Sequence, residues 1–319
     1  ETRYKYRIFN EGNYTNYIEG KPESSSKPDT IEIVFENKDT SVSKGSKVGE
    51  YLTHPAFTSF ESNGFWMGKF ETTGSTSNIT VKPNNTSLRN INVKTMFELA
   101  YNYNRDLDSH MLKNTEWGAA TYLSYSVYGI NDEVNINNNS NFVTGYSAVE
   151  GTDQSSYPGT YGTDTSVTQA YNTETGYKAS TTGNISGVYD MSGGAWEYVA
   201  AYMKDTYKDS GFDASSISSY NSKYFDIYPS DSSWTSYNKR ILGDATGEMG
   251  PFYYYQDKDG NNRIHNSWFG DYSYFVDASH PWFVRGGGYT DGVLAGQSYF
   301  DRHTGGADGL VGFRLALAD

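Results

Sequence analysis

Residues 289–311, YTDGVLAGQSYFDRHTGGADGLV, combine the side-chain types that suit recognition of a ligand. Aromatic and arginine side chains carry much of the binding energy at interfaces, and small residues between them let a ligand approach the backbone. We therefore predict a ligand-binding surface patch that tolerates substitution, formed by Tyr289, Asp291, Tyr299, Asp301, Arg302, His303 and Asp308. The alternative is an ordinary polar loop packed on the core.

Residue types that enzymes commonly use for chemistry are absent or unsuitably spaced. Cysteine does not occur in the 319 residues, which excludes thiolate nucleophiles, disulfides and cysteine-based zinc sites. The 5 histidines include no pair with i, i+4 or His-x-His spacing, so we expect no histidine metal site. No G-x-S-x-G sequence is present to display a nucleophilic serine. We expect no catalytic residue and no enzymatic activity.

The composition favours an extracellular binding protein. The net charge is −13 and no basic cluster is present, which argues against nucleic acid as a partner. The 30 tyrosines are typical of adaptable binding surfaces, and the alternative is a β-rich protein that uses tyrosine in its strands. A polar chain without cysteine predicts a bacterial cell surface or a phage virion. Since no apolar run reaches the length of a membrane span, we expect membrane anchoring only through a segment that this sequence does not include.

Two segments in the first half of the chain have the apolar spacing and end signals of helices. In 93–107, Thr95 and Glu98 match a capping box, and the expected buried face consists of Met96, Ala100, Tyr103 and Leu107. In 113–129, Asn114 is placed to cap the helix, Glu116 lies in its first turn, and Gly129 ends it. Its expected buried side chains are Trp117, Ala120 and Val127.

A third helix is predicted over 196–203. Gly193 and Gly194 permit a tight entrance to it, and the helical spacing of a buried stripe is met by Trp196, Val199, Ala200 and Met203. Trp196 heads this stripe, so we expect its ring to fill the centre of the core.

The remaining pattern predicts short strands and long loops. Residues 1–48 contain two strand-like runs and read as a small β appendage or linker before a domain at 49–319. A hairpin is expected over 253–265 with its turn at Asp259-Gly260, a loop over 282–292, and a terminal strand over 311–319. The predicted fold class is therefore α+β with long irregular loops.

Four short motifs in this order resemble the formylglycine-generating-enzyme (sulfatase-modifying factor) family. They are LKNTEWGAATYL at 112–123, YDMSGGAWEYV at 189–199, FVRGGGY at 283–289 and VGFRLAL at 311–317. The resemblance covers roughly 52–319 and implies a C-type-lectin-like fold. The oxidase activity of that family needs a cysteine pair that this chain lacks. The chain looks closest to non-enzymatic members: bacterial surface proteins, phage tail proteins and the variable proteins of diversity-generating retroelements.

The resemblance also bears on calcium and on two arginines. The family places calcium beside a Glu that matches Glu197, but Gly194 replaces the family's Asn ligand. We expect at most one structural calcium near Glu197, held largely by backbone oxygens; the alternative is that Glu197 makes a structural pair. Arg285 and Arg314 are flanked by apolar strand residues, which predicts buried, carboxylate-paired structural roles.

Together these observations predict a non-enzymatic adhesin or receptor-binding protein that uses its C-terminal loops to bind a cell-surface protein or glycan. A structural subunit of a pilus-like filament or phage tail stays open as the alternative, with assembly into a larger surface or virion structure. An enzyme of the same fold with cysteine-independent chemistry is the third possibility.

Overall fold

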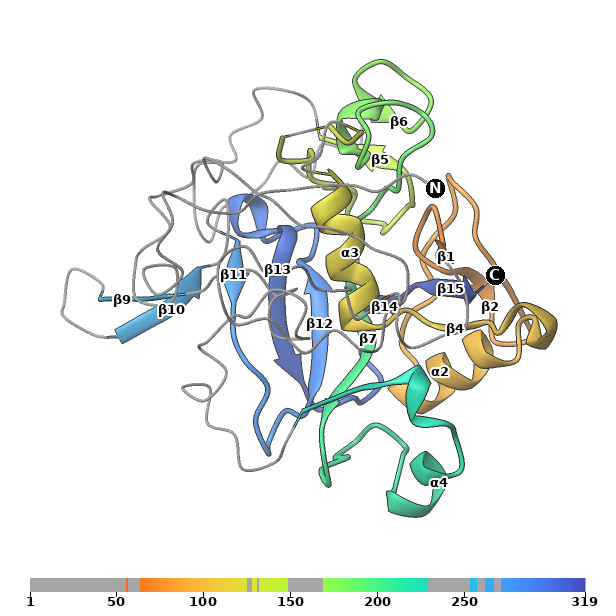
Figure 1. Ribbon diagram of the computed structural model, residues 1–319. Helices are drawn as coiled ribbons and strands as arrows, with labels where there is room; N and C mark the ends of the chain where they lie inside the picture. The colour runs from red at the N-terminus through yellow and green to blue at the C-terminus, as the bar shows by residue number, and fades with distance from the viewer. Residues whose placement is uncertain are drawn as a thin grey trace, which may run out of the picture.

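The computed structural model describes residues 56, 64–124, 128–130, 132–148, 169–228, 253–256, 262–266 and 271–318. These residues form a mixed α+β structure with several sheets and few helices (Figure 1). The expected β appendage at 1–48 and its boundary with the following domain lie outside the described residues.

The largest sheet among the described residues has eight strands and carries the core on both of its faces. Its main path runs in the order β14-β7-β12-β13-β11-β10-β9, and β8 pairs with β7. Figure 1 shows β7, β12 and β13 at the centre, with β9 and β10 projecting to the left. The strand bounds are Trp196–Met203 (β7), Asp226–Tyr228 (β8), Tyr253–Gln256 (β9), Asn262–Asn266 (β10), Tyr272–Ser273 (β11), Trp282–Gly286 (β12), Gly296–His303 (β13) and Val311–Phe313 (β14).

The segment 196–203 is strand β7, so its predicted helix is wrong. Its side chains alternate between two cores: Tyr198, Ala200 and Tyr202 belong to the first, and Val199, Ala201 and Met203 belong to the second. A strand buried on both faces is apolar throughout, and such a run satisfies helical spacing by chance. The strand assignment follows from pairing with β12, β14 and β8, which local spacing does not reveal.

Helix α2 (Val93–Tyr101) packs against the first core through Val93, Met96, Phe97 and Ala100. The predicted capping box is wrong, because Asn92 is the N-cap and its side chain accepts a hydrogen bond from the Thr95 backbone. The helix also ends before Tyr103 and Leu107, which are exposed rather than buried.

Helix α3 (Asn114–Ser124) packs against the second core through Trp117 and Ala120, as predicted. Asn114 is its first residue, and Glu116 lies in its first turn. The Glu116 carboxylate accepts a hydrogen bond from the Lys113 backbone N–H at 2.9 Å, which helps satisfy the start of the helix. Val127 lies outside the described residues.

Smaller elements surround the central sheet. A three-stranded sheet has the order β1-β15-β4, and β2-β3 and β5-β6 are two-stranded. Their bounds are Phe65–Met67 (β1), Thr73–Ser75 (β2), Asn78–Thr80 (β3), His110–Met111 (β4), Tyr146–Ser147 (β5), Gln169–Ala170 (β6) and Leu315–Ala318 (β15). The short helices are α4 (Ala214–Ser218), η2 (Arg105–Leu107), η3 (Gly176–Ala179), η4 (Ser222–Tyr224) and η7 (Gly292–Leu294).

The predictions for the last third of the chain have mixed outcomes. Strands β9 and β10 pair antiparallel, as the predicted hairpin requires, although its turn at Asp259-Gly260 lies outside the described residues. The terminal strand is confirmed as β14 and β15. The predicted loop at 282–292 is wrong in its first part, because 282–286 form β12. Among the described residues, no helix has the length and apolar character that a membrane span requires.

Candidate functional site

A buried ion pair joins the central sheet to the end of the chain. Arg314 Nε lies 3.0 Å from Glu197 Oε2, and Arg314 Nη2 lies 2.5 Å from Glu197 Oε1. Both side chains are fully buried. Arg314 also donates to the backbone oxygens of Gly68 and Asp190. The prediction that Arg314 is a buried, carboxylate-paired residue is therefore confirmed.

Two further buried carboxylates lie near this pair. Glu71 accepts hydrogen bonds from the Ala195 backbone N–H and from the Ser87 hydroxyl, and Asp190 Oδ1 accepts from Asn137 Nδ2 at 2.9 Å. Burial raises the pKa of Glu71 well above its usual range, and the charges of Asp190 and Glu197 add to that rise. Burial raises the pKa of Glu197 to about 7, although Arg314 opposes the shift. Arg314 thus compensates a concentration of buried negative charge.

The glycine turn before β7 is needed by this carboxylate cluster. Gly194 has φ +74°, and a Cβ atom there would lie 2.4 Å from Glu71 Oε1. Gly193 has φ +75°, and its Cβ would meet the backbone oxygen of Asn137 at 2.4 Å. A side chain at either position would both strain the backbone and displace a partner.

The expected calcium ligand Glu197 has both carboxylate oxygens engaged by Arg314. Its structural pairing, the alternative raised from the sequence, is therefore present. Within the described ranges, no group of three or more His, Cys, Asp or Glu side chains is arranged to hold a metal ion. Calcium near Glu197 stays a prediction, and melting curves in EDTA and in millimolar calcium test it, because a ligand of the folded state raises the melting temperature.

Arg285 is also buried, as predicted, and holds helix α3 to β13. Its guanidinium donates to the backbone oxygen of Tyr299 at 2.8 Å, to Asn114 Oδ1 at 2.6 Å and to the backbone oxygen of Gln297 at 3.2 Å. The Arg285 charge also opposes the rise that burial causes in the pKa of Asp271. These three acceptors are neutral oxygens, so the burial of Arg285 is confirmed and its carboxylate pairing stays a prediction.

Several loops meet at one end of the central sheet. Strands β7 and β14 are parallel and begin together, with Trp196 opposite Val311. Strand β12 is antiparallel to β7 and ends there, and Gly286 at its end pairs with Gly296 at the start of β13. The loops before β7, after β12 and before β14 therefore emerge side by side. We call their side chains Trp196, Tyr289, Asp291, Asp308 and Leu310 the loop face.

Trp196 anchors this loop face at the edge of the core. Its indole Nε1 donates to Asp291 Oδ2 at 2.6 Å, and its backbone N–H donates to the Leu310 oxygen at 3.0 Å. Gly288 lies against the ring, where a Cβ atom would be 3.1 Å from Nε1. The prediction that Trp196 fills the centre of the core is wrong: its ring is only partly buried and packs at the margin of the first core.

Aromatic stacking connects Tyr289 to segments that are distant in sequence. The Tyr289 ring meets Phe142 edge-on, with 4.9 Å between ring centroids. The Arg89 guanidinium lies 3.6 Å from the Phe142 ring centroid and donates to the Gly309 backbone oxygen. The Tyr289 backbone N–H donates to the Gly194 oxygen at 2.9 Å. The loops of the loop face are therefore fixed to the scaffold.

The seven residues predicted as one patch come from the loop face and from β13, and one of them is buried. Tyr289, Asp291 and Asp308 belong to the loop face, and Asp301, Arg302 and His303 lie on β13 opposite the first residues of β12. The two groups meet, because His303 contacts Asp308 and the charge of Asp291 adds to the rise in the pKa of Asp301. Tyr299 is 3% exposed and belongs to the first core, so its expected surface position is wrong.

The three residues at the end of β13 make contacts within the protein. Arg302 stacks on Tyr274 at 3.8 Å from the ring centroid and forms an ion pair with Asp277. His303 contacts the Tyr198 hydroxyl through Nδ1, and its Nε2 lies 3.3 Å from Asp308 Oδ2. Burial raises the pKa of Asp301 to about 7. Burial also lowers the pKa of His303, against the opposing effect of Asp308.

Three residues at the loop face were not predicted from the sequence: Arg89, Phe142 and Leu310. Leu310 is 45% exposed, and its position between a glycine and an apolar strand was an available signal. Arg89 and Phe142 reach the loop face only through the fold, so no local pattern could indicate them.

A scan against models of known protein families found no match, and a search of curated proteins found none either. The contacts of the chain itself therefore carry the functional interpretation.

Proposed function

We propose that this chain is a non-enzymatic, surface-displayed binding protein with a C-type-lectin-like fold of the formylglycine-generating-enzyme type. The fold assignment is supported by contacts among the four motif segments. Leu112 donates its backbone N–H to the Arg314 oxygen at 2.9 Å and accepts from Ala200, directly after the second motif, at 2.8 Å. The second motif is also joined to the fourth through Glu197 and Arg314, and the first to the third through Asn114 and Arg285.

The observation that carries the binding role is the construction of the loop face. It brings together a partly exposed tryptophan and tyrosine, an exposed leucine and two carboxylates. Aromatic anchors in such a setting supply binding energy, and loops on a rigid scaffold are common sites of recognition. Backbone hydrogen bonds from Trp196 and Tyr289 and the Arg89–Phe142 stack hold the loops in place. Binding to such a preordered surface requires little further ordering of the protein.

The ligand class that suits this face is a cell-surface protein or a glycan. The binding protein itself would be displayed on a bacterial surface or a phage virion. The net charge of −13 disfavours anionic polymers as partners. The lack of cysteine excludes the oxidase chemistry of the family that the motifs resemble.

The proposal is tested by replacing Tyr289 and Leu310 together with serine. The control replaces a tyrosine and an aliphatic residue outside the loop face, Tyr128 and Ile227, both exposed, with serine. Each protein is applied to glycan and cell-surface protein arrays, and its melting temperature is recorded. We expect the loop-face variant to stay folded and to lose the array signals, with the control unchanged. Retained signals in the folded loop-face variant, or equal loss in the control, would contradict the proposal.

A further inference from the structure

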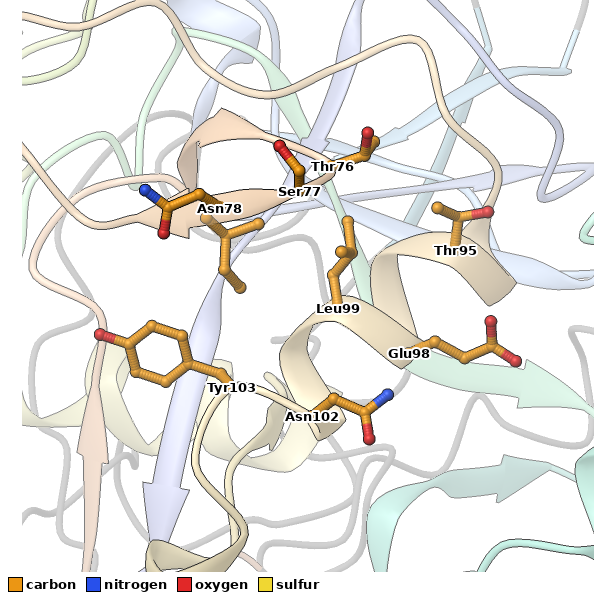
Figure 2. A pocket seen from close by; sticks show the side chains of 9 residues that line it. Thr76, Ser77, Asn78, Thr95, Glu98, Leu99, Asn102 and Tyr103 are labelled. Atoms are coloured by element: carbon orange, nitrogen blue, oxygen red, sulfur yellow. The ribbon is translucent and has the colours of Figure 1, made fainter.

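A hollow lies between the β2–β3 hairpin and the C-terminal half of helix α2 (Figure 2). Its volume is about 520 Å³, within the roughly 300–1,000 Å³ of small-molecule sites. Figure 2 shows Leu99 pointing from the helix toward the hairpin, with Tyr103 and Asn78 on one side. This cleft shares no residue with the loop face.

The cleft combines an apolar floor with neutral polar walls. Ile79 and Leu99 form the apolar part, and both contribute to or pack against the first core. The polar part includes the hydroxyls of Thr76, Ser77 and Thr95. Tyr103 adds a ring that is 47% exposed. An aromatic face beside hydroxyl and amide groups matches a ligand that has both an apolar face and many hydroxyls.

Several polar groups at the cleft are available to a ligand. In the described part of the chain, the side chains of Asn78, Asn102 and Tyr103 make no hydrogen bond to the protein, whereas Thr95 is engaged by Asn92. An amide side chain can donate and accept at once, and a tyrosine hydroxyl can do the same. Two amides and a phenol therefore suit the vicinal hydroxyls of a sugar, each of which also donates and accepts.

The charges around the cleft exclude strongly ionic ligands. Among the described residues that line the cleft, Glu98 is the one charged residue, and its carboxylate faces other partners. It accepts a hydrogen bond from the Tyr220 hydroxyl at 3.2 Å, and Lys94 lies 4.0 Å away. In Figure 2 it is turned away from Tyr103 and Asn78. Within the described part of the chain, no basic side chain lines the cleft to bind an anion. One carboxylate with a lysine nearby is a poor site for a cation, which needs several oxygen ligands.

We propose that this cleft binds one ring of a neutral saccharide. The apolar face of the ring packs on Tyr103 and the Ile79–Leu99 floor, and its hydroxyls bond to Asn78 and Asn102. The site is separate from the proposed loop face and acts whether or not that face binds a ligand. A saccharide held here would give the protein a second, glycan-directed contact with a surface, and two linked contacts increase avidity.

The test uses methyl glycosides of glucose, galactose, mannose and N-acetylglucosamine as probes, with the full chain and saturation-transfer NMR. We expect at least one glycoside to bind. Tyr103→Ala should raise its dissociation constant about tenfold. Tyr103→Phe keeps the ring and should restore most of the affinity. Tyr128→Ala removes a tyrosine that is 58% exposed outside the cleft and should leave binding unchanged.

Three results would overturn the proposal: no transfer to any of the glycosides, equal binding by Tyr103→Ala and wild type, or equal loss in Tyr128→Ala. The loop-face variant with Tyr289 and Leu310 replaced separates the two proposals. It should retain glycoside binding in the cleft even if its array signals are lost. If that variant loses glycoside binding and Tyr103→Ala retains it, the sugar site lies elsewhere and the inference is contradicted.

Discussion

Replacing Arg314 by methionine should expose the cost of the buried carboxylate cluster. Methionine keeps much of the side-chain length but removes the charge that compensates Glu71, Asp190 and Glu197. Removing one partner of a buried ion pair destabilises proteins by about 3–5 kcal/mol. Burial already raises the pKa of Glu197 to about 7 against the opposing charge of Arg314, so loss of that charge should disfavour the ionised carboxylate further.

The loss should depend on pH in a defined direction. A carboxyl whose pKa is higher in the folded than in the unfolded state contributes its stability fully below the unfolded pKa. That contribution is lost as pH rises through the folded pKa. For Glu197 the window runs from about 4.5 to about 7 in the parent protein. Without Arg314 the folded pKa rises further, so the variant keeps losing stability above pH 7.

Urea denaturation at pH 5 and pH 8 measures this difference in the free energy of unfolding. We expect Arg314→Met to lose about 3–5 kcal/mol at pH 8 and clearly less at pH 5, where Glu197 is protonated in the folded state. Adding Glu197→Gln to Arg314→Met should recover part of the loss at pH 8. The reasoning is refuted if the loss is equal at both pH values, or if the double variant is no more stable than the single one.

Three further predictions concern local geometry. Gly194→Ala should cost about 1–3 kcal/mol, because φ is positive and the new Cβ meets Glu71; an unchanged melting temperature would contradict this. Asn92→Ala should cost about 1 kcal/mol as loss of the true N-cap, whereas Glu98→Ala, a test of the mistaken capping box, should cost less in the same urea titration. Trp196→Phe should cost about 1 kcal/mol by removing the hydrogen bond to Asp291, and a loss of about 3–5 kcal/mol would instead indicate a core position.

Several features with local sequence signals were predicted correctly, although the capping box of α2 was not. Helix α3 was indicated by Glu116 and by the spacing of Trp117 and Ala120. These signals all lie within one or two helical turns of one another. The hairpin of β9 and β10 and the terminal strands follow from short alternating runs. The buried role of Arg314 followed from its apolar flanks, although its partner Glu197 lies 117 residues away.

Features that depend on distant pairing were missed. Strand β7 meets a helical spacing rule because nearly every residue in it is apolar, and only its neighbours in the sheet identify it as a strand. The predicted patch was contiguous in sequence, but the pleat of β13 turns Tyr299 into the core. Arg89 and Phe142 join the loop face across long sequence separations.

The loop face should tolerate sequence variation while the scaffold beneath it stays folded. Displaying two libraries on yeast tests this, one randomised at Tyr289, Asp308 and Leu310 and the other at Glu71, Glu197 and Arg314. Protease resistance and binding to a ligand identified on the arrays are measured in the same sort. We predict that most variants of the loop-face library resist the protease and no longer bind the ligand of the parent protein. Most variants of the library at Glu71, Glu197 and Arg314 should be cleaved. A loop-face library that is mostly cleaved, or that mostly still binds, would contradict the account.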